Sequence, residues 1–279
     1  MEIQRSGLGI GGAQQRTARG LEKTNRALSK ILNRLSTAQR INRASDDAAG
    51  LSISEQLRTQ VRGFKMASRN VSDAISALNI GEGASNEITD LLQRNRELAI
   101  QARNDTLTDE QRQQLDVEFQ QNLAEIDRIA NTAQFNGQNV INGTGLGAGE
   151  AQIQAGANEN ETIQLPEINL GVNPLGLTGA AVLNGEEAGA AIDLIDNALN
   201  TLNTARSTMG ATVNRLESSI RNLEVAEINT QSAEEMLRDE DMAAGITELT
   251  RTRLLEESGI FAFRRFNEIS ANHIMSLIQ

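Results

Sequence analysis

The sequence contains few of the residues that catalytic and metal sites require. Its 279 residues include no Cys, no Trp and no Tyr, with one His and two Pro. Without Cys the chain has no disulfide, no thiolate metal ligand and no Cys nucleophile. The only histidine, His273, lies in an apolar C-terminal stretch, which excludes a paired-His zinc site and argues against a Ser-His-Asp triad. We therefore expect no enzyme, no cofactor and no metal site, and we expect His273 at a core or interface position.

Long apolar runs are also absent. No stretch approaches the roughly 20 apolar residues of a membrane span, so we expect no membrane insertion. The first residues, MEIQRSGLGIGG, lack the apolar core of a secretory signal. If the protein leaves the cell, we expect it to do so without a cleaved signal peptide.

Charge is distributed unevenly along the chain. The net charge of −11 argues against nucleic acid as the main partner. Residues 1–45 hold nine Lys or Arg against two Glu, whereas residues 222–257 hold ten Asp or Glu against three Arg. A basic start is also typical of an organelle transit peptide or a phosphate-binding arm, but neither accounts for the acidic stretch. The two ends of the chain are electrostatic complements.

Apolar residues recur with helical spacing over most of the chain, and the scarcity of Pro permits long helices. A heptad stripe begins at Leu21 and continues through Leu28, Ile31 and Leu35, which is typical of a coiled-coil seam. A second pattern, over residues 75–102, predicts another helix.

A loop with the sequence NDTLTDEQ ends that helix, and Thr108 with Gln111 has the spacing of a capping box. The next helix is predicted to run to about Ala130. Because a short loop joins the two helices, they should form an antiparallel pair.

The C-terminal half predicts one very long helix. Its heptad positions are Ile195, Leu202, Met209, Leu216 and Leu223. Because no Pro follows, we expect an uninterrupted helix over residues 189–257, on the order of 100 Å long at about 1.5 Å per residue. Arg206 and Glu227 interrupt its companion seam. After Gly259 the chain is apolar on more than one face, as expected of a segment buried between subunits.

Residues 132–186 have the composition of strands and turns. Gly, Asn and Thr are frequent, three Asn-Gly pairs and both prolines occur there, and ETIQL alternates polar with apolar residues. The segment is too short for a domain with a substantial core of its own. We expect a hairpin-rich insertion at one end of a helical body.

Two short motifs have the spacing of known sites without their context. GLGIGG at residues 7–12 fits G-x-G-x-x-G, but a dinucleotide site also needs a preceding strand and an acidic residue about 20 positions on. Only six residues precede Gly7, and residues 25–34 contain no acid. RDEDMA at 238–243 lacks the glycine and spacing of a calcium loop, so we expect it on a solvent-facing or Arg-facing helical surface.

Several longer stretches resemble bacterial flagellin, in the order in which that family has them. ALSKILNRLSTAQRINRASDDAAGLSISEQLRTQVRG is similar to the N-terminal signature, and LLQRNRELAIQARNDT and EIDRIANTAQFNG are similar to the blocks that follow. EEMLRDEDMAAGITELTRTRLLEESG and ANHIMSLIQ resemble the C-terminal part. The opening SGLGIGGAQQ, the Phe- and Arg-rich GIFAFRRFNEISANHI and the very short middle depart from the usual pattern.

The resemblance implies a mainly α fold, with long helical coiled-coil arms from both termini, a helical bundle and a small β-hairpin-rich insertion. Residues 1–44 with 238–279 would form an inner coiled-coil tube domain. Residues 45–142 with 186–237 would form the surrounding bundle, and residues 143–185 a short variable insertion that projects outward. Because each helical Gly costs about 1 kcal/mol relative to Ala, we expect the glycine-rich opening to be a pliant arm.

The function that the resemblance implies is mechanical. The chain would be a structural subunit that polymerises with itself into a hollow helical filament for motility. The resemblance further implies an export chaperone and the type III export apparatus, assembly with filament cap and hook-filament junction proteins, and an extracellular place in the bacterial flagellum. Two alternatives are a hook-filament junction protein and a cytoplasmic coiled-coil scaffold.

The predicted site residues are interface residues. Those of the tube are Leu21, Leu28, Ile31, Leu35, Ile260, Phe263, Phe266 and Ile269. Residues 40–50, which include Arg40, Asp46 and Asp47, are predicted to connect the two layers. LLQRNRELA and VEFQQNLAEIDR resemble the surface that the flagellin-sensing Toll-like receptor reads. That match carries over three candidate contacts, namely Arg94, Leu98 and Glu118.

Overall fold

The computed structural model describes the backbone of residues 3–278 and the side chains of residues 12, 15–269 and 271. The chain forms two compact units. Residues 1–58 with 230–279 form the arm unit, and residues 59–229 form the bundle unit. The predicted three-part division of the chain stays a prediction. The side chain of His273 lies outside the described residues.

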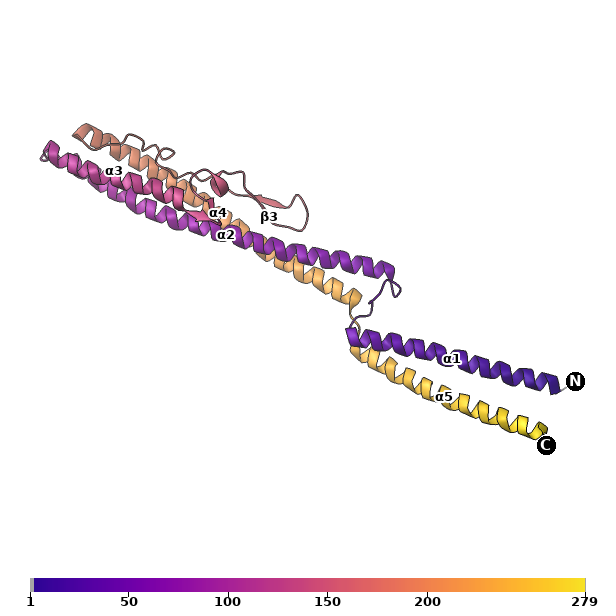
Figure 1. The fold of residues 1–279 in the computed structure, drawn as a ribbon. Helices are drawn as coiled ribbons and strands as arrows, with labels where there is room; N and C mark the ends of the chain where they lie inside the picture. The colour runs from indigo at the N-terminus through magenta and orange to yellow at the C-terminus, as the bar shows by residue number, and fades with distance from the viewer. Residues whose placement is uncertain (1–2, 279) are drawn as a thin grey trace. The chain divides into compact units, whose positions relative to one another are not determined.

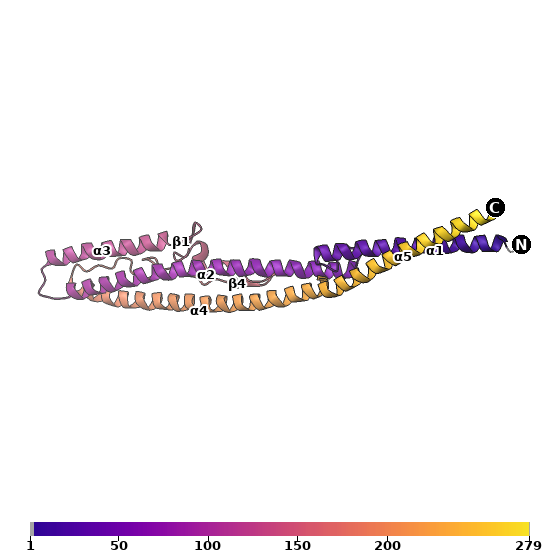
Figure 2. The ribbon, with the colours of Figure 1, turned by 90° about the horizontal axis from the view of Figure 1, so that it is seen from below.

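The arm unit is built on two long helices, α1 (Ile3–Thr37) and α5 (Met242–Ile278), which lie side by side (Figures 1 and 2). The glycine-rich opening was expected to weaken the first turns, but α1 is helical from Ile3 onward. Two glycines of α5 allow a close approach of the helices. A Cβ on Gly245 would lie 2.8 Å from Leu35 Cδ2, and one on Gly259 would lie 3.5 Å from Leu21 Cδ1.

The bundle unit contains most of α2 (Ala48–Ala102), α3 (Asp109–Thr132) and most of α4 (Gly185–Arg238). The capping box predicted before α3 is confirmed, because the Thr108 side chain accepts from the Gln111 N–H and the Gln111 side chain accepts from the Thr108 N–H. The predicted heptad of α4 is also confirmed as a core stripe. Its exposed fractions are Ile195 0%, Leu202 0%, Met209 2%, Leu216 0% and Leu223 7%.

Two short hairpins follow α3. The first pairs β1 (Gln134–Phe135) with β2 (Gln138–Asn139), and the second pairs β3 (Gln152–Gln154) with β4 (Thr162–Gln164), both antiparallel. A short 3₁₀ turn, η1 (Gly145–Gly147), lies between them. Asn136 and Gly137 have φ values of 51° and 77°, the positive values that a two-residue type I′ turn requires.

The insertion was expected at one end of the helical body, and this prediction is wrong. The insertion runs along the bundle, where Ala157 approaches Gly63 and Gly185 lies near Asp105. Its side chains join the common core, with Ile141, Leu170, Leu177 and Val182 fully buried. The physical reason is that α3 is much shorter than α2 and α4. The apolar faces of α2 and α4 therefore continue beyond the end of α3. The insertion covers the remainder.

The sequence predicted one uninterrupted helix over residues 189–257, and this prediction is wrong. The helix breaks after Arg238, at the end of α4, and α5 begins at Met242. The Asp241 carboxylate accepts hydrogen bonds from the backbone N–H groups of Ala243 and Ala244, which is an N-cap. Residues 239–241 of RDEDMA therefore form a link between helices, whereas Arg238 ends α4 and Met242 and Ala243 begin α5. α5 continues past Gly259 without a break.

Candidate assembly surfaces

The connector, residues 38–47, joins α1 to α2 within the arm unit. Ala38 ends α1 with a φ of 54°, a left-handed conformation that Gly usually takes. The Arg40 N–H donates to the Arg238 carbonyl at 2.7 Å, and Arg40 Nη2 donates to the Leu237 carbonyl at 2.8 Å. The Glu240 N–H in turn donates to the Ala38 carbonyl at 3.0 Å. The connector is thus bonded to the end of α4 and to the α4–α5 link, by two backbone bonds and by the Arg40 side chain.

The two adjacent aspartates of the connector have different tasks. Asp46 pairs with Lys30 of α1 at 2.9 Å and accepts the N–H groups of Asn42 and Arg43. The hydrogen bond from Lys30 holds the pKa of the Asp46 carboxyl below its ordinary value. Asp47 accepts the Gly50 N–H at 2.9 Å in the first turn of α2. Asp46 therefore holds the connector on α1, whereas Asp47 stabilises the start of α2.

The seam residues predicted on α1 lie between the two arm helices. Ile31 is 5% exposed, and Leu21, Leu28 and Leu35 are half-buried. In the single chain this seam is only partly covered.

The α5 residues predicted for the tube are less buried. Phe263 and Phe266 are half-buried, whereas Ile260 is 36% and Ile269 57% exposed. Phe261, which the sequence pattern did not single out, is 64% exposed and lies 5.6 Å from Arg265 in a cation–π arrangement.

Sequence periodicity also missed a set of exposed apolar residues outside the predicted heptad positions. On α4 they are Val225, Ile228 and Met236, and on α5 they are Ile246, Leu254 and Leu255. Apolar residues just beside a heptad stripe would have been the signal for them.

The three candidate receptor contacts lie where α2 packs against α3. Arg94 of α2 pairs with Glu118 of α3 at 2.8 Å and with Glu97 at 3.1 Å. The hydrogen bond to Glu118 raises the pKa of the Arg94 guanidinium. Leu98, in contrast, is 1% exposed, so its side chain lies in the core and does not present itself to a partner. The predicted direct contact of Leu98 with a receptor conflicts with this burial, because the side chain is part of the bundle core.

The two charges that interrupt the α4 seam are both matched on α2. Arg206 Nη2 lies 3.9 Å from Glu82 Oε1, and Glu227 Oε1 lies 3.4 Å from Lys65 Nζ. Each interruption of the apolar pattern is therefore an interhelical ion pair. The sequence showed the charges but not their partners.

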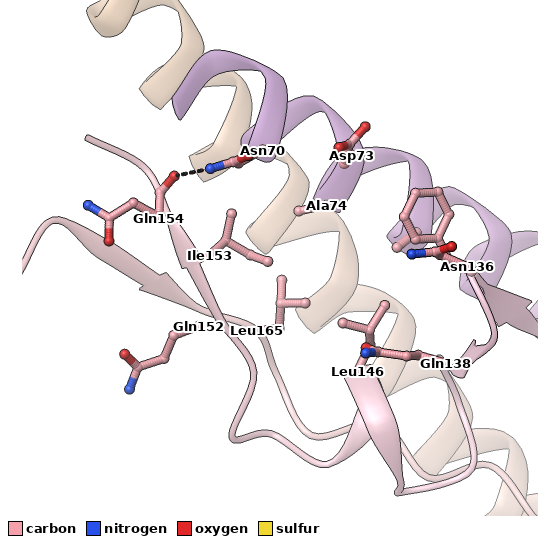
Figure 3. A pocket seen from close by; sticks show the side chains of 12 residues that line it. Asn70, Asp73, Ala74, Asn136, Gln138, Leu146, Gln152, Ile153, Gln154 and Leu165 are labelled. Atoms are coloured by element: carbon pink, nitrogen blue, oxygen red, sulfur yellow. Dashed lines mark hydrogen bonds between the residues drawn. The ribbon is translucent and has the colours of Figure 1, made fainter. Parts of the chain in front are cut away.

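A groove of about 360 Å³ lies between α2 and the two hairpins (Figure 3). Asn70 Nδ2 donates across it to the Gln154 carbonyl at 3.4 Å. Its apolar lining includes Ala74, Ile153 and Leu165, and amides surround these residues. Among the described residues that line it, Asp73 is the only titratable one, so the groove offers no acid–base pair.

The described part of the chain contains no group of three or more His, Asp or Glu placed to hold a metal ion. None of its helices is long and apolar enough to span a lipid bilayer.

Comparison with known proteins places this geometry in a family. Residues 11–145 match the bacterial flagellin N-terminal helical region, and residues 192–278 match the bacterial flagellin C-terminal helical region. A flagellar filament 31.3 kDa core protein of Treponema maltophilum is 38% identical, over 94% of this chain and 96% of its own length. A flagellin of Halalkalibacterium halodurans is 43% identical, over 82% of this chain and 84% of its own length.

Solved structures give the same result for the fold. The chain is similar to a Bacillus cereus flagellin crystal structure, with 33% identity, a TM-score of 0.50, and coverage of 56% of this chain and 88% of that one. A putative flagellar hook-associated protein of Vibrio parahaemolyticus shares the fold at 16% identity, with a TM-score of 0.58 and coverage of 69% and 99%. With both terminal regions matched and filament proteins aligned over most of its length, the chain belongs to the bacterial flagellin family and is a structural subunit of the flagellar filament.

Proposed function

We propose that this flagellin polymerises by burying the exposed faces of α1 and α5 against the same helices of neighbouring copies. The observation that carries the proposal is the apolar surface of α5. Ile246, Leu254, Leu255, Phe261 and Ile269 are each between 53% and 64% exposed.

The magnitude of this burial favours contacts with several neighbours. Burying five such side chains yields on the order of 7–15 kcal/mol, whereas association costs about 4–15 kcal/mol in lost freedom. A single pairwise contact that buries part of this surface is therefore weak. A helical polymer, in which each copy touches several others, buries all of it.

In the proposed filament, residues 1–44 with 238–279 line an inner tube, residues 45–142 with 186–237 form the bundle around it, and residues 143–185 lie outermost. Support for the tube comes from the incomplete burial of Leu21, Leu28 and Leu35 within one chain. The backbone bonds of the connector support its role as the link between the layers.

The route of the chain to the filament is also a proposal. We infer that it is exported unfolded through the flagellar type III apparatus, with a chaperone covering its apolar arms, and that it assembles outside the cell beneath a cap and upon hook-filament junction proteins. The exposed apolar residues of α5 support the need for such a cover.

A host receptor is a further proposed partner. Arg94 and Glu118 form an exposed pair of a multidentate donor and an acceptor, the kind of polar contact found at interface hot spots. We propose that the flagellin-sensing Toll-like receptor contacts this pair, with Leu98 supporting it from the core.

The proposal of arm-driven assembly is tested by deleting residues 259–279. This removes three Phe and five Ile or Leu from α5 and none of the core stripe of α4. We expect the shortened chain to form no filaments by electron microscopy or sedimentation. Its bundle unit should have the same melting temperature as in the native chain. Normal filaments from the shortened chain would contradict the proposal.

A further inference from the structure

The first half of the arm unit contains a groove lined with positive charge. It has a volume of about 390 Å³ and lies between the C-terminal half of α1 and the connector. Four basic residues line it, namely Arg26, Lys30, Arg34 and Arg43, and Asp46 is the only acidic residue among its described lining. The remaining lining is Asn25, Ser29, Asn33, Asn42 and Ser45, so it offers further polar groups.

The charges of this basic groove are only partly compensated within the chain. Asp46 pairs with Lys30, and Arg26 lies 3.8 Å from Glu22 with both side chains largely exposed. Arg34 and Arg43 make no ion pair with any carboxylate in the described part of the chain, and Arg34 Nε is buried there without a hydrogen-bond partner. Arg34 and Arg43 can therefore pair with carboxylates of another molecule, because the described part of their own chain supplies none.

The same unit contains a matching acidic segment. The α4–α5 link carries Asp239, Glu240 and Asp241, and both aspartates are exposed. Asp241 is used as the cap of α5, but the carboxylates of Asp239 and Glu240 have no ion pair among the described residues. Opposite charges on two surfaces of one chain attract when two copies meet.

The acidic link does not satisfy the groove of its own chain. Its backbone is tied to the connector by the pairing of Gln39 with Asp239 and by the bond from Glu240 to Ala38. Held there, it forms no ion pair with Arg34 or Arg43 within the described part of its own chain. The groove and the link are two different patches on one chain, so the groove of each copy is free to receive the link of the next. Such a head-to-tail contact generates a helical polymer when the rotation between copies does not close into a ring.

From this arrangement we propose that the basic groove of one subunit receives the acidic α4–α5 link of a second copy, with Arg34 and Arg43 facing Asp239 and Glu240. The proposal rests on the assembly proposed above and adds to it the contact that orients neighbouring subunits. The apolar faces of the arms supply the affinity, and this contact sets the register between copies.

Charge reversal with rescue tests the contact. Arg34→Glu with Arg43→Glu leaves the Lys30–Asp46 pair in place, and Asp239→Arg with Glu240→Arg leaves the Asp241 cap in place. Each double variant is expected to elongate from native seeds about tenfold more slowly. The chain with all four changes, elongating from seeds of the same fourfold chain, is expected to regain most of the native rate. Arg215→Glu with Arg221→Glu is the matched control for net charge, and the acidic-link variant should not rescue it.

Disulfide trapping gives an independent measurement, because the native chain has no cysteine. A mixture of Arg43→Cys chains and Asp239→Cys chains is assembled and oxidised, and mass spectrometry identifies the cross-linked pairs. We expect a disulfide-linked heterodimer of the two variants in filaments and not in monomers. A mixture of Arg215→Cys with Asp239→Cys is the control and should give none.

The outcomes separate this inference from the assembly proposal. If native chains form filaments but the fourfold variant is no faster than the groove variant, or no heterodimer is trapped, the groove contact is wrong and assembly stands. If native chains form no filaments, both are wrong. Circular dichroism of each variant establishes that the helices are retained.

Discussion

Residues one helical turn apart on α2 have different surroundings and so different expected roles. Arg94 and Leu98 are four positions apart, yet the side chain of Arg94 is 50% exposed and Leu98 is 1% exposed. Glu118 of α3 reaches Arg94 across the helix pair. In the proposed receptor contact the partner therefore meets the exposed ion pair, whereas Leu98 belongs to the core of the bundle unit.

This difference predicts two distinct effects of mutation. Arg94→Ala and Glu118→Ala should reduce signalling by monomers in cells that carry the flagellin-sensing receptor, with the melting temperature close to the native value. Leu98→Ala should destabilise the bundle by about 2–5 kcal/mol, because it leaves a cavity in the core. Arg128→Ala is the control, since Arg128 forms a comparable exposed pair with Glu125.

The receptor proposal has a clear contrary result. Native monomers that fail to signal would remove the receptor as a partner. Active native monomers with equally active Arg94→Ala and Glu118→Ala chains would place the contact elsewhere on the protein.

At the scale of elements, helix ends decide the architecture, and each end has an identifiable cause. The start of α3 is fixed by the capping box of Thr108 with Gln111. The preceding end of α2 is held from α3, because Arg112 Nε donates to the Ala102 carbonyl at 2.9 Å. The loop between these helices is thus bonded at both ends.

We predict that Thr108→Ala destabilises the bundle unit by about 1 kcal/mol, because one backbone N–H in the first turn of α3 loses its acceptor. Chemical denaturation followed by circular dichroism measures the change. Thr106→Ala in the same exposed loop is the matched control and should have little effect. Equal stability of the two variants would show that the capping box contributes nothing measurable.

Sequence reasoning succeeded where one local pattern determined the outcome. The Thr108 cap, the α4 stripe and the Asn136 turn each depend on neighbours within a few residues. Sequence reasoning failed where contacts with segments distant in the chain determine the local structure. The break after Arg238 depends on backbone bonds to the connector about 200 positions earlier in the chain. The course of the insertion depends on the length of α2 and α4 that α3 leaves uncovered.

The candidate site divides in the same way. The seam of α1 follows from periodicity, whereas most of the exposed apolar residues of α5 lie outside the predicted heptad positions. The burial of Leu98 and the partners of Arg206 and Glu227 do not, because they are set by which face of α2 meets which neighbour.

For the whole molecule, the two units differ in how completely they are buried. The bundle unit has a continuous core, whereas the arm unit is a helix pair with its outer faces exposed. Stability in such a molecule is not uniform, and segments with little buried apolar surface open first.

Limited proteolysis of a verified monomer should therefore remove residues 1–40 and 245–279 first. Protease concentration is kept low enough to leave the bundle unit intact, and mass spectrometry identifies the cut sites. In assembled filaments the same segments should be protected, because neighbouring copies cover them. Arms that resist protease in the monomer as well would show that they are stable before assembly.

The ion pairs of Arg206 with Glu82 and of Glu227 with Lys65 have a consequence for a shaft that turns under load. Torque on a bundle of long rods produces shear between them, and a uniform leucine stripe resists shear poorly, because a slip by one heptad exchanges one leucine for another. A charged residue beside the stripe makes the slipped register less stable than the native one. After a slip by one heptad along α2, Arg206 would lie opposite Ile75 or Thr89 in place of Glu82 and would lose its ion-pair partner, and leaving a half-buried charge unpaired is costly. We therefore expect the Arg206–Glu82 pair to favour one register of α2 against α4 under shear, even where it adds little to the stability of the resting bundle.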